Sequence, residues 1–304
     1  MNYRHAFHAG NFADVLKHVV LARLLAALQK KETPLRVIDT HAGAGLYDLA
    51  GDEATRGGEW RDGIGRLDAA RLNDSAEALI APYRSVVDAV RESAGATIYP
   101  GSPEIARRMA RAQDRVLLSE AHPATAAALR AAMTRDRRVK VLAQNGWTTL
   151  NAAIPPPERR GIVLIDPAFE SPDEFSLIAR ALPAAWRKWP TGVYALWHPI
   201  KDGAVVERFM TRIVEAGVEK ILRVELLVSA PEAQGLRGCG MLVVNPPWTL
   251  KDELDALLPD LTRLLRRGPG ARWRNEWLAP ERTAVPTGGP TATSHPSTQG
   301  RTTR

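Results

Sequence analysis

A carboxylate, a proline and an aromatic ring follow an apolar run in the middle of the chain, in an arrangement that suits a planar substrate bearing an amino group. The run at 161–165 reads Gly-Ile-Val-Leu-Ile, and Asp166, Pro167, Ala168 and Phe169 come directly after it. A carboxylate and a backbone carbonyl can accept the two N–H bonds of an amine, and a flat ring can stack on a base. The alternative interpretation is a strand followed by an ordinary turn.

The elements that would position this stretch alternate between apolar runs and helical periodicities, as in a doubly wound α/β sheet. We expect strands at 35–39, 115–119, 139–142, 162–165 and 192–197, and helices near 12–30, 103–113, 123–134, 173–188, 202–216 and 250–267. The last two strands, 220–227 and 240–245, lie too close for a crossover helix and should be antiparallel. The predicted fold class is α/β, with a mostly parallel sheet and a terminal antiparallel pair.

The segment 47–98 interrupts this alternation because it contains no strong strand. In an uninterrupted βαβ unit, an acidic residue follows the glycine-rich loop by about 20 residues. Here Glu120 follows the loop by about 75 residues, so we infer a helical insertion at 47–98 within a core of residues 1–46 and 99–280. Residues 281–304 are rich in Thr, Pro, Gly and Ser, which predicts a disordered tail.

Residues 40–46, Thr-His-Ala-Gly-Ala-Gly-Leu, join a predicted strand to a glycine-rich loop. Gly43 and Gly45 would let the backbone approach a ligand closely. Asp48 stands where a dinucleotide-binding G-x-G-x-x-G has its third glycine, which disfavours a pyrophosphate cradle and a nicotinamide oxidoreductase. The loop favours a nucleoside ligand without phosphates, such as S-adenosylmethionine.

Ligands of open α/β sheets bind outside the carboxyl ends of the parallel strands. That rule brings together His41, Gly43, Gly45, Glu120, Asn145, Asp166 and Phe169. Glu120 could accept hydrogen bonds from two ribose hydroxyls, and Asn145 could bond an adenine edge. For each strand-end residue the alternative is a helix N-cap, but four successive strand ends with compatible groups favour a nucleoside-type cofactor.

A second segment, Asn245-Pro-Pro-Trp248, matches the Asp/Asn/Ser-Pro-Pro-aromatic pattern of amino-group methylation better than residues 166–169 do. If the strand at 240–245 is antiparallel to the others, its carboxyl end lies at the opposite rim. The segment would then be a turn entering the last helix, and Asp166 would keep the site.

The net charge of +7 and pI of about 9.8 favour a polyanionic partner such as nucleic acid. Together with the basic N-terminus, basic clusters at 107–111, 135–140 and 159–160 could follow a phosphate backbone if they share a face. No apolar run is long enough for a membrane span, and no signal peptide is evident. The lone cysteine, Cys239, suits a reducing cytoplasm and has a structural role.

Four histidines, His5, His8, His18 and His198, are candidate ligands by residue type. The spacing of His5, His8 and His18 fits no usual metal pattern, so we expect no metal site. His198 precedes Pro199 at the end of a predicted strand and could lie near the ligand rim, without an assigned role.

Five segments carry a resemblance to a known family: Tyr-Arg-His-Ala-Phe-His-Ala-Gly-Asn at 3–11, Ala-Asp-Val-Leu-Lys-His at 13–18, Asp-Thr-His-Ala-Gly-Ala-Gly at 39–45, Tyr-Pro-Gly-Ser-Pro at 99–103 and Asn-Pro-Pro-Trp at 245–248. They closely resemble the bacterial RlmJ family of S-adenosylmethionine-dependent 23S ribosomal RNA adenine-N6 methyltransferases. The resemblance runs from residue 1 to about 280 and implies a Rossmann-like class I methyltransferase with a small helical insertion.

The resemblance also implies roles for particular residues. Cofactor-site positions fall on His18, His41, Ser102, Glu120, Asn145, Gly146 and Asp166, with Lys17 beside them. Asp166 matches the catalytic acid, and Tyr3 matches a tyrosine that approaches the substrate adenine. Two departures stand out: the family usually has Asp-Gly at 145–146 and Asp-Pro-Pro-Tyr at 166–169. Ala168 loses the rigidity of proline, a change of roughly 0.4–1 kcal/mol at a compatible site.

The resulting hypothesis is direct methyl transfer to adenine N6, with the amine held by Asp166 and the Pro167 carbonyl and the base stacked on Phe169. We expect a monomer that acts in the cytoplasm on 23S ribosomal RNA. One alternative is a DNA adenine-N6 methyltransferase with the same catalytic groups. Another, suggested by Ala168, is a catalytically weakened protein that retains the cofactor and binds RNA.

Overall fold

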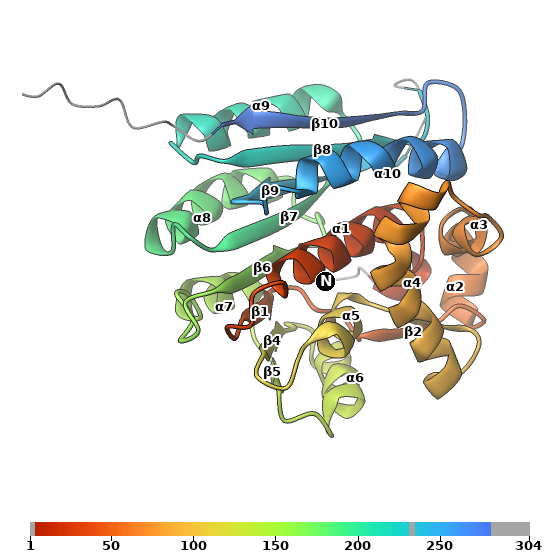
Figure 1. Cartoon of the computed structure of the whole chain (residues 1–304), viewed down its shortest axis with the longest axis horizontal. Helices are drawn as coiled ribbons and strands as arrows, with labels where there is room; N and C mark the ends of the chain where they lie inside the picture. Colours follow the sequence, from red (N-terminus) through yellow and green to blue (C-terminus); the bar gives the residue numbers. More distant parts are fainter. Residues whose placement is uncertain (1–3, 231–234, 281–304) are drawn as a thin grey trace, which may run out of the picture.

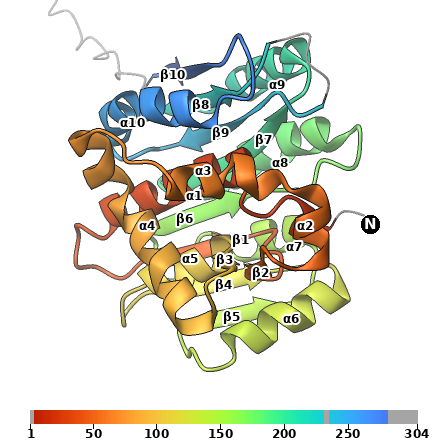
Figure 2. The same ribbon diagram turned by 90° about the vertical axis from the view of Figure 1, so that its right-hand side faces the viewer.

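An eight-stranded sheet with helices on both faces forms the centre of the molecule (Figures 1 and 2). The computed structural model describes residues 4–230 and 235–280. From one edge to the other the strands are β10 (Arg272–Ala279), β8 (Ile221–Leu227), β9 (Gly238–Val244), β7 (Val193–Ile200), β6 (Gly161–Ile165), β1 (Arg36–Asp39), β4 (Arg115–Ser119) and β5 (Val139–Leu142).

The strand directions confirm the predicted fold class. The strands from β5 to β7 pair in parallel, whereas β9 is antiparallel to both β7 and β8. The short connection between β8 and β9 leaves no room for a crossover, which forces this reversal. The chain runs from β1 outward to β4 and β5 and then returns to β6 on the other side of β1. This change of direction at β1 is the topological switch point, where open α/β sheets bind ligands.

The principal helices are α1 (Phe12–Leu28), α4 (Asp74–Ala94), α5 (Ser102–Met109), α6 (Pro123–Met133), α7 (Gly146–Ala152), α8 (Glu174–Lys188), α9 (Gly203–Glu215) and α10 (Leu250–Leu265). One apolar cluster joins the sheet to α1, α4, α5 and α10, and a second joins the opposite face to α7, α8 and α9. Strand β6 alternates between them: Ile162 and Leu164 pack in the first cluster, Val163 and Ile165 in the second. A strand buried on both faces reads as a continuous apolar run.

Helix α1 has no solvent-exposed polar face over most of its length. Every residue from Phe12 to Leu25 is buried, because α4, α5, α10 and β9 all pack around the helix. Its charged side chains, among them Asp14 and Lys17, therefore lie inside the protein and need partners there.

The predicted insertion contains β2 (Leu46–Asp48), α2 (Asp52–Gly57), the 3-10 helix η2 (Glu59–Asp62), α3 (Ile64–Asp68) and α4, and it ends at β3 (Ile98–Pro100). Strands β2 and β3 form a separate antiparallel pair that the sequence did not predict. Helix α4 lies against α1 and α10 (Figure 1). The division into a core and an insertion subdomain stays a prediction, and the predicted disordered tail at 281–304 lies outside the described residues.

Two further predictions about strands were wrong. Residues 272–279, where no element was expected, form the edge strand β10. Strand β7 continues to Ile200, so His198 lies within the strand and is fully buried instead of standing at the ligand rim. Pro199 is tolerated there because β6 has already ended; its last pair with β7 is Ile165 with Leu196.

Across residues 4–230 and 235–280, no helix combines the length and apolarity that crossing a membrane requires.

Candidate cofactor and substrate site

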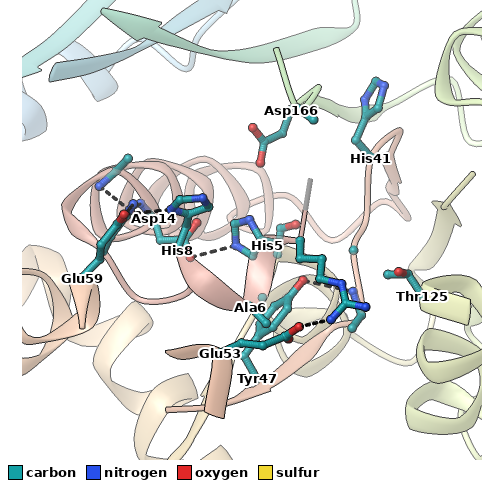
Figure 3. A pocket seen from close by; sticks show the side chains of 18 of the residues that line it. His5, Ala6, His8, Asp14, His41, Tyr47, Glu53, Glu59, Thr125 and Asp166 are labelled. Atoms are coloured by element: carbon teal, nitrogen blue, oxygen red, sulfur yellow. Dashed lines mark hydrogen bonds and ion pairs between the residues drawn. The ribbon is translucent and has the colours of Figure 1, made fainter. Parts of the chain in front are cut away.

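A cleft of about 1460 Å³ opens at the switch point of the sheet, between the carboxyl ends of β1, β4 and β6 and the segment that precedes α1. Sites for a single drug-sized ligand are about 300–1,000 Å³, so this cleft has room for a cofactor together with a nucleotide. Its lining includes the predicted site residues Lys17, His18, His41, Gly43, Ser102, Glu120, Asp166, Pro167 and Phe169. Figure 3 shows Asp166 and His41 on one side of the cleft and Tyr47 and Glu53 on the other.

Asp166 at the end of β6 forms an ion pair with a buried lysine from α1. The Lys17 Nζ lies 2.5 Å from an Asp166 oxygen and 2.8 Å from Asp14, one turn earlier in the same helix. Asp14 also accepts hydrogen bonds from the Gly10 N–H and interacts with the His5 ring at 3.0 Å. The side chains of Lys17 and Asp14 are only 5% and 3% exposed. One cation is therefore shared between two carboxylates with little water around it.

The pKa values of this triad follow from burial and charge. Burial alone would lower the pKa of Lys17, but Asp14 and Asp166 outweigh it and raise that pKa well above its usual value. Burial would raise the pKa of Asp14, but His5 and Lys17 hold it well below its usual value. Lys17 is therefore a permanent cation beside Asp166. Lys17 was predicted as part of the cofactor site, without its role beside Asp166, and Asp14 was not among the predicted residues. Their i, i+3 spacing inside an apolar helix was the available signal.

Phe169 has an unusual backbone conformation for an aromatic residue, with φ of 50°. Such left-handed conformations cost about 1–3 kcal/mol and cluster at functional sites. The ring packs against Phe175 and Trp197, with centroid distances of 4.9 and 5.8 Å, and these contacts hold it at the cleft beside Pro167. The turn after β6 is thus a strained and well-supported aromatic platform.

The glycine-rich loop is held by Glu120 and Tyr47. Gly43 has φ of 67° and donates its N–H to Glu120 Oε2 at 2.9 Å. A Cβ at Gly43 would lie 2.3 Å from the Tyr47 hydroxyl, which itself accepts the Ala44 N–H at 3.0 Å. Glu120 also accepts the His122 N–H at 2.7 Å and still has lone pairs for other donors.

A buried acid at the end of β1 organises two further predicted residues. Asp39 accepts the Ser102 hydroxyl at 2.6 Å and the His41 N–H at 3.2 Å. Burial raises the pKa of Asp39 to about 7, against the hydrogen bond from Ser102 and with added repulsion from Asp166. Asp39 was not among the predicted site residues, although an acid ending the strand before a glycine loop was visible in the sequence.

Asn145 and Gly146 lie outside the lining of the cleft and build its border. The Asn145 side chain caps α7 by accepting the Trp147 N–H at 2.8 Å, the alternative that the sequence left open. Gly146 packs so tightly that an added Cβ would lie 2.1 Å from the Thr40 carbonyl oxygen and 2.9 Å from the His41 ring. Because Gly146 has no side chain, the His41 ring can occupy this space.

Substitution of Gly146 by Ala should lower the free energy of unfolding by about 1–3 kcal/mol, because the obstacle is backbone that no side-chain rotation can move. Urea denaturation measures this change. Gly203→Ala is the matched control, since a Cβ there meets nothing within 4 Å. An unfolding free energy of Gly146→Ala equal to that of Gly203→Ala would contradict the prediction.

His18 is fully buried and forms the inner wall of the cleft, with Nδ1 2.8 Å from the Tyr99 hydroxyl. Tyr3 lies outside the described residues. In the described part of the chain, no group of three or more His, Cys, Asp or Glu side chains is arranged to hold a metal ion.

The competing Asn245-Pro-Pro-Trp248 segment lies at the opposite rim, as the antiparallel direction of β9 requires. The Asn245 amide donates to the carbonyl oxygens of Pro190 and Gly192, and Trp248 is 86% exposed. This segment is the turn into α10, and it takes no part in the cleft.

Four arginines of the three basic clusters are paired with acids. Arg107 and Arg108 pair with Glu104, Arg111 with Asp114, and Arg138 with Asp136. Arg160 donates to backbone carbonyls of residues 28 and 33. Besides Lys17, the cations that line the cleft are Arg4, Arg56, Lys201 and Arg267, and none of them belongs to the three clusters.

Comparisons with known proteins agree with this architecture. The family model described as ribosomal RNA large subunit methyltransferase D, RlmJ, matches residues 32–279. The ribosomal RNA large subunit methyltransferase J of Haemophilus influenzae is 40% identical over 285 residues, covering 92% of this chain and 100% of that protein. The protein of the same name from Escherichia coli K12 is 38% identical over 283 residues, with the same coverage.

A solved structure shares the fold over most of the chain. The crystal structure of protein LPL1258 from Legionella pneumophila superposes with a TM-score of 0.80 at 37% identity, covering 89% of this chain and 98% of that one. The sheet order, the cleft at the switch point and these similarities all support the same family assignment. The chain belongs to the RlmJ family of ribosomal RNA large subunit methyltransferases.

Proposed function

We propose that this protein transfers the methyl group of S-adenosylmethionine to N6 of an adenine in 23S ribosomal RNA. The observation that carries the proposal is the turn Asp166–Phe169 at the switch point, where an acid fixed by Lys17 lies beside a carbonyl and a strained aromatic ring. Family membership supports ribosomal RNA as the substrate class.

The residues of the cleft fit a nucleoside cofactor that carries an amino acid. Glu120 has lone pairs left for ribose hydroxyls after binding the Gly43 and His122 N–H groups. The Nε2 of His18 is buried without a partner among the described residues, which is costly unless a ligand satisfies it. When bound, S-adenosylmethionine supplies an electrophilic methyl group on a positively charged sulfur.

Groups of the protein make the amine of the adenine more nucleophilic. Adenine N6 is a poor nucleophile because its lone pair is delocalised into the ring. If the Asp166 carboxylate and the Pro167 carbonyl accept its two N–H bonds, the lone pair becomes more localised on the nitrogen. Lys17 holds the carboxylate in place from behind, and Asp166 is the nearest acceptor for the proton that the amine releases.

Phe169→Ala should lower kcat/KM for the RNA by about 5- to 150-fold, because base stacking on an aromatic side chain is worth about 1–3 kcal/mol. Affinity for S-adenosylmethionine, measured by calorimetry, should change little. Phe169→Tyr is the control and should keep activity near that of the unchanged protein, since the stacking ring remains. An unchanged kcat/KM in Phe169→Ala would show that the base stacks elsewhere.

The substrate is tested by incorporation of labelled methyl groups into protein-free 23S RNA, a 16S RNA control and duplex DNA. We expect N6-methyladenine at one position of 23S RNA and none in duplex DNA. Methylation of duplex DNA alone would favour the DNA enzyme. Cofactor binding without product on any RNA would instead support the weakened, RNA-binding alternative suggested by Ala168.

The proposal extends to the oligomeric state of the protein, its location and the residues that contact RNA. We propose that it acts as a monomer in the cytoplasm, with the cleft-lining cations Arg4, Arg56, Lys201 and Arg267 contacting RNA phosphates. Sedimentation at micromolar concentration tests the monomer, and the salt dependence of RNA binding tests the cationic contacts.

A further inference from the structure

Two tyrosine hydroxyls connect the helical segment 47–98 to the inner wall of the cleft. The Tyr83 hydroxyl on α4 lies 2.9 Å from the Tyr99 hydroxyl on β3, which lies 2.8 Å from Nδ1 of His18 on α1. The three residues are 1%, 0% and 0% exposed, so water does not take part. The residues thus form an isolated chain of hydrogen bonds that ends at the cofactor site.

The number of available protons determines which group donates and which accepts in each hydrogen bond of this chain. Each hydroxyl has one proton to donate, and among the described residues Tyr83 has no hydrogen-bond partner except Tyr99. If Tyr83 donates to Tyr99 and Tyr99 donates to His18 Nδ1, both hydroxyl protons are used. In the reverse direction, Nδ1–H donates to Tyr99, Tyr99 donates to Tyr83, and the buried Tyr83 proton has no acceptor. The first direction instead leaves over the Nε2–H of His18. His18 lines the cleft, where a molecule can accept from that N–H, whereas Tyr83 does not. A buried unsatisfied donor costs about 1–3 kcal/mol, so the first direction is favoured.

This direction determines what His18 presents to the cleft. With Nδ1 as acceptor, the single proton of a neutral imidazole must lie on Nε2. Burial lowers the pKa of His18 to about 3, so the ring is neutral near pH 7. His18 lines the cleft, and its buried Nε2 has no partner among the described residues. The group presented to a ligand is therefore an N–H donor.

We propose that Tyr99 is a positioning residue that holds His18 in the Nε2–H tautomer, so that His18 donates to the carboxylate of bound S-adenosylmethionine. This inference rests on the proposed function, because the carboxylate is the only anionic group of that cofactor. A buried N–H donor prefers a charged acceptor, since charge-assisted hydrogen bonds are the stronger ones.

A second histidine at the cleft provides an internal comparison. The Thr40 hydroxyl donates to the Leu164 carbonyl at 3.0 Å and lies 2.8 Å from Nδ1 of His41. The Thr40 hydroxyl has only one proton, and it donates that proton to Leu164. His41 Nδ1 must therefore donate to the hydroxyl oxygen, and the Nε2 of His41 is an acceptor. The two histidines should therefore be fixed in opposite tautomers, and only that of His18 depends on Tyr99.

Nitrogen NMR of the full-length protein labelled in histidine tests the tautomers directly, without any ligand. The His18 signals, assigned by their loss in His18→Gln, should show Nε2–H in the unchanged protein and a mixture of tautomers in Tyr99→Phe. The His41 signals should show Nδ1–H in both. Tyr83→Phe is the matched control: it also removes one buried hydroxyl but leaves Tyr99 to donate, so His18 should stay Nε2–H. An Nδ1–H His18 in the unchanged protein would overturn the proposal.

Cofactor binding supplies the second readout. Tyr99→Phe should weaken S-adenosylmethionine binding by about tenfold with kcat nearly unchanged at saturating cofactor, whereas Tyr83→Phe should stay within about twofold. Decarboxylated S-adenosylmethionine should bind both Tyr99→Phe and the unchanged protein with similar affinity, because its lost carboxylate is the group that His18 contacts. Equal losses for both ligands would overturn the proposal and leave methyl transfer unaffected. A protein that binds neither ligand would refute the proposed function, while the tautomers would still decide the role of Tyr99.

Discussion

Replacing Asp166 by Asn should lower the rate of methyl transfer to 23S RNA by about 10²- to 10⁴-fold at saturating cofactor. The substitution keeps the size of the side chain but removes the negative charge that accepts from the amine and pairs with Lys17. An asparagine also presents an NH₂ group, which would face the N–H bonds of adenine N6 if it took the wrong orientation. Single-turnover incorporation of labelled methyl groups measures the rate without product release.

The control for this experiment is Asp173→Asn. Asp173 lies in the same connection between β6 and α8, is exposed, and forms no side-chain cap with α8, so its loss should leave the rate unchanged. Calorimetry with S-adenosylmethionine separates a catalytic effect from loss of the cofactor. Asp166→Asn with an undiminished single-turnover rate would rule out an essential carboxylate and, with it, the assignment of the turn at 166–169 as the catalytic centre.

Replacing Lys17 by Met should lower the free energy of unfolding at pH 8 by about 3–5 kcal/mol and abolish measurable methyl transfer. Removing one partner of a buried ion pair leaves an uncompensated buried charge, and that is the origin of costs of this size. Here the loss leaves two carboxylates, Asp14 and Asp166, with side chains 3% and 14% exposed. Urea denaturation followed by circular dichroism gives the unfolding free energy.

The pH dependence of this loss has a definite sign. Asp14 has a folded pKa below its usual value, so its contribution to stability is present above the unfolded pKa and disappears as the pH falls through the folded pKa. Burial raises the pKa of Asp14, whereas His5 and Lys17 lower it. Loss of Lys17 therefore raises that pKa, and protonation at lower pH relieves the repulsion. The stability difference between Lys17→Met and the unchanged protein should therefore shrink from pH 8 to pH 5.

Lys251→Met is the matched control, because Lys251 forms a partly exposed pair with Asp255 at 2.7 Å. Pairs of that kind are worth about 0–1 kcal/mol, and the variant should unfold almost like the unchanged protein. Lys17→Arg, which keeps the charge, should recover part of the stability. A Lys17→Met protein as stable as Lys251→Met at pH 8 would show that water reaches the triad and that Lys17 does not support Asp166 electrostatically.

Much of this architecture could be predicted from local patterns. The apolar run at 161–165 identified a strand buried on both faces, because such a strand needs apolar side chains at every position. The short connection before 240–245 predicted an antiparallel strand, which placed Asn245 at the far rim and Asp166 at the ligand rim. These inferences succeeded because strand direction and connection length follow from the chain itself.

Other features depended on which distant segments pack together. The sequence of β10 contains Arg, Trp, Asn and Glu, as an exposed edge strand can. Only its pairing with β8 makes it part of the sheet. The basic clusters looked free in the sequence although their acidic partners lie only two to four residues away, because spacing alone does not show which side chains pair. The arginines that pair with Glu104, Asp114 and Asp136 stabilise the fold.

The sequence by itself determined the α/β class, the positions of most strands along the chain and the place of Asp166 after β6, because hydrophobic periodicity and connection length are properties of neighbouring residues. Only the tertiary structure decided the environment of that acid. Helix α1 is buried on every side because α4, α5, α10 and β9 surround it, which places Lys17 against Asp166 and His18 against Tyr99. Such contacts join residues that are far apart in the chain, and no spacing along the sequence specifies them.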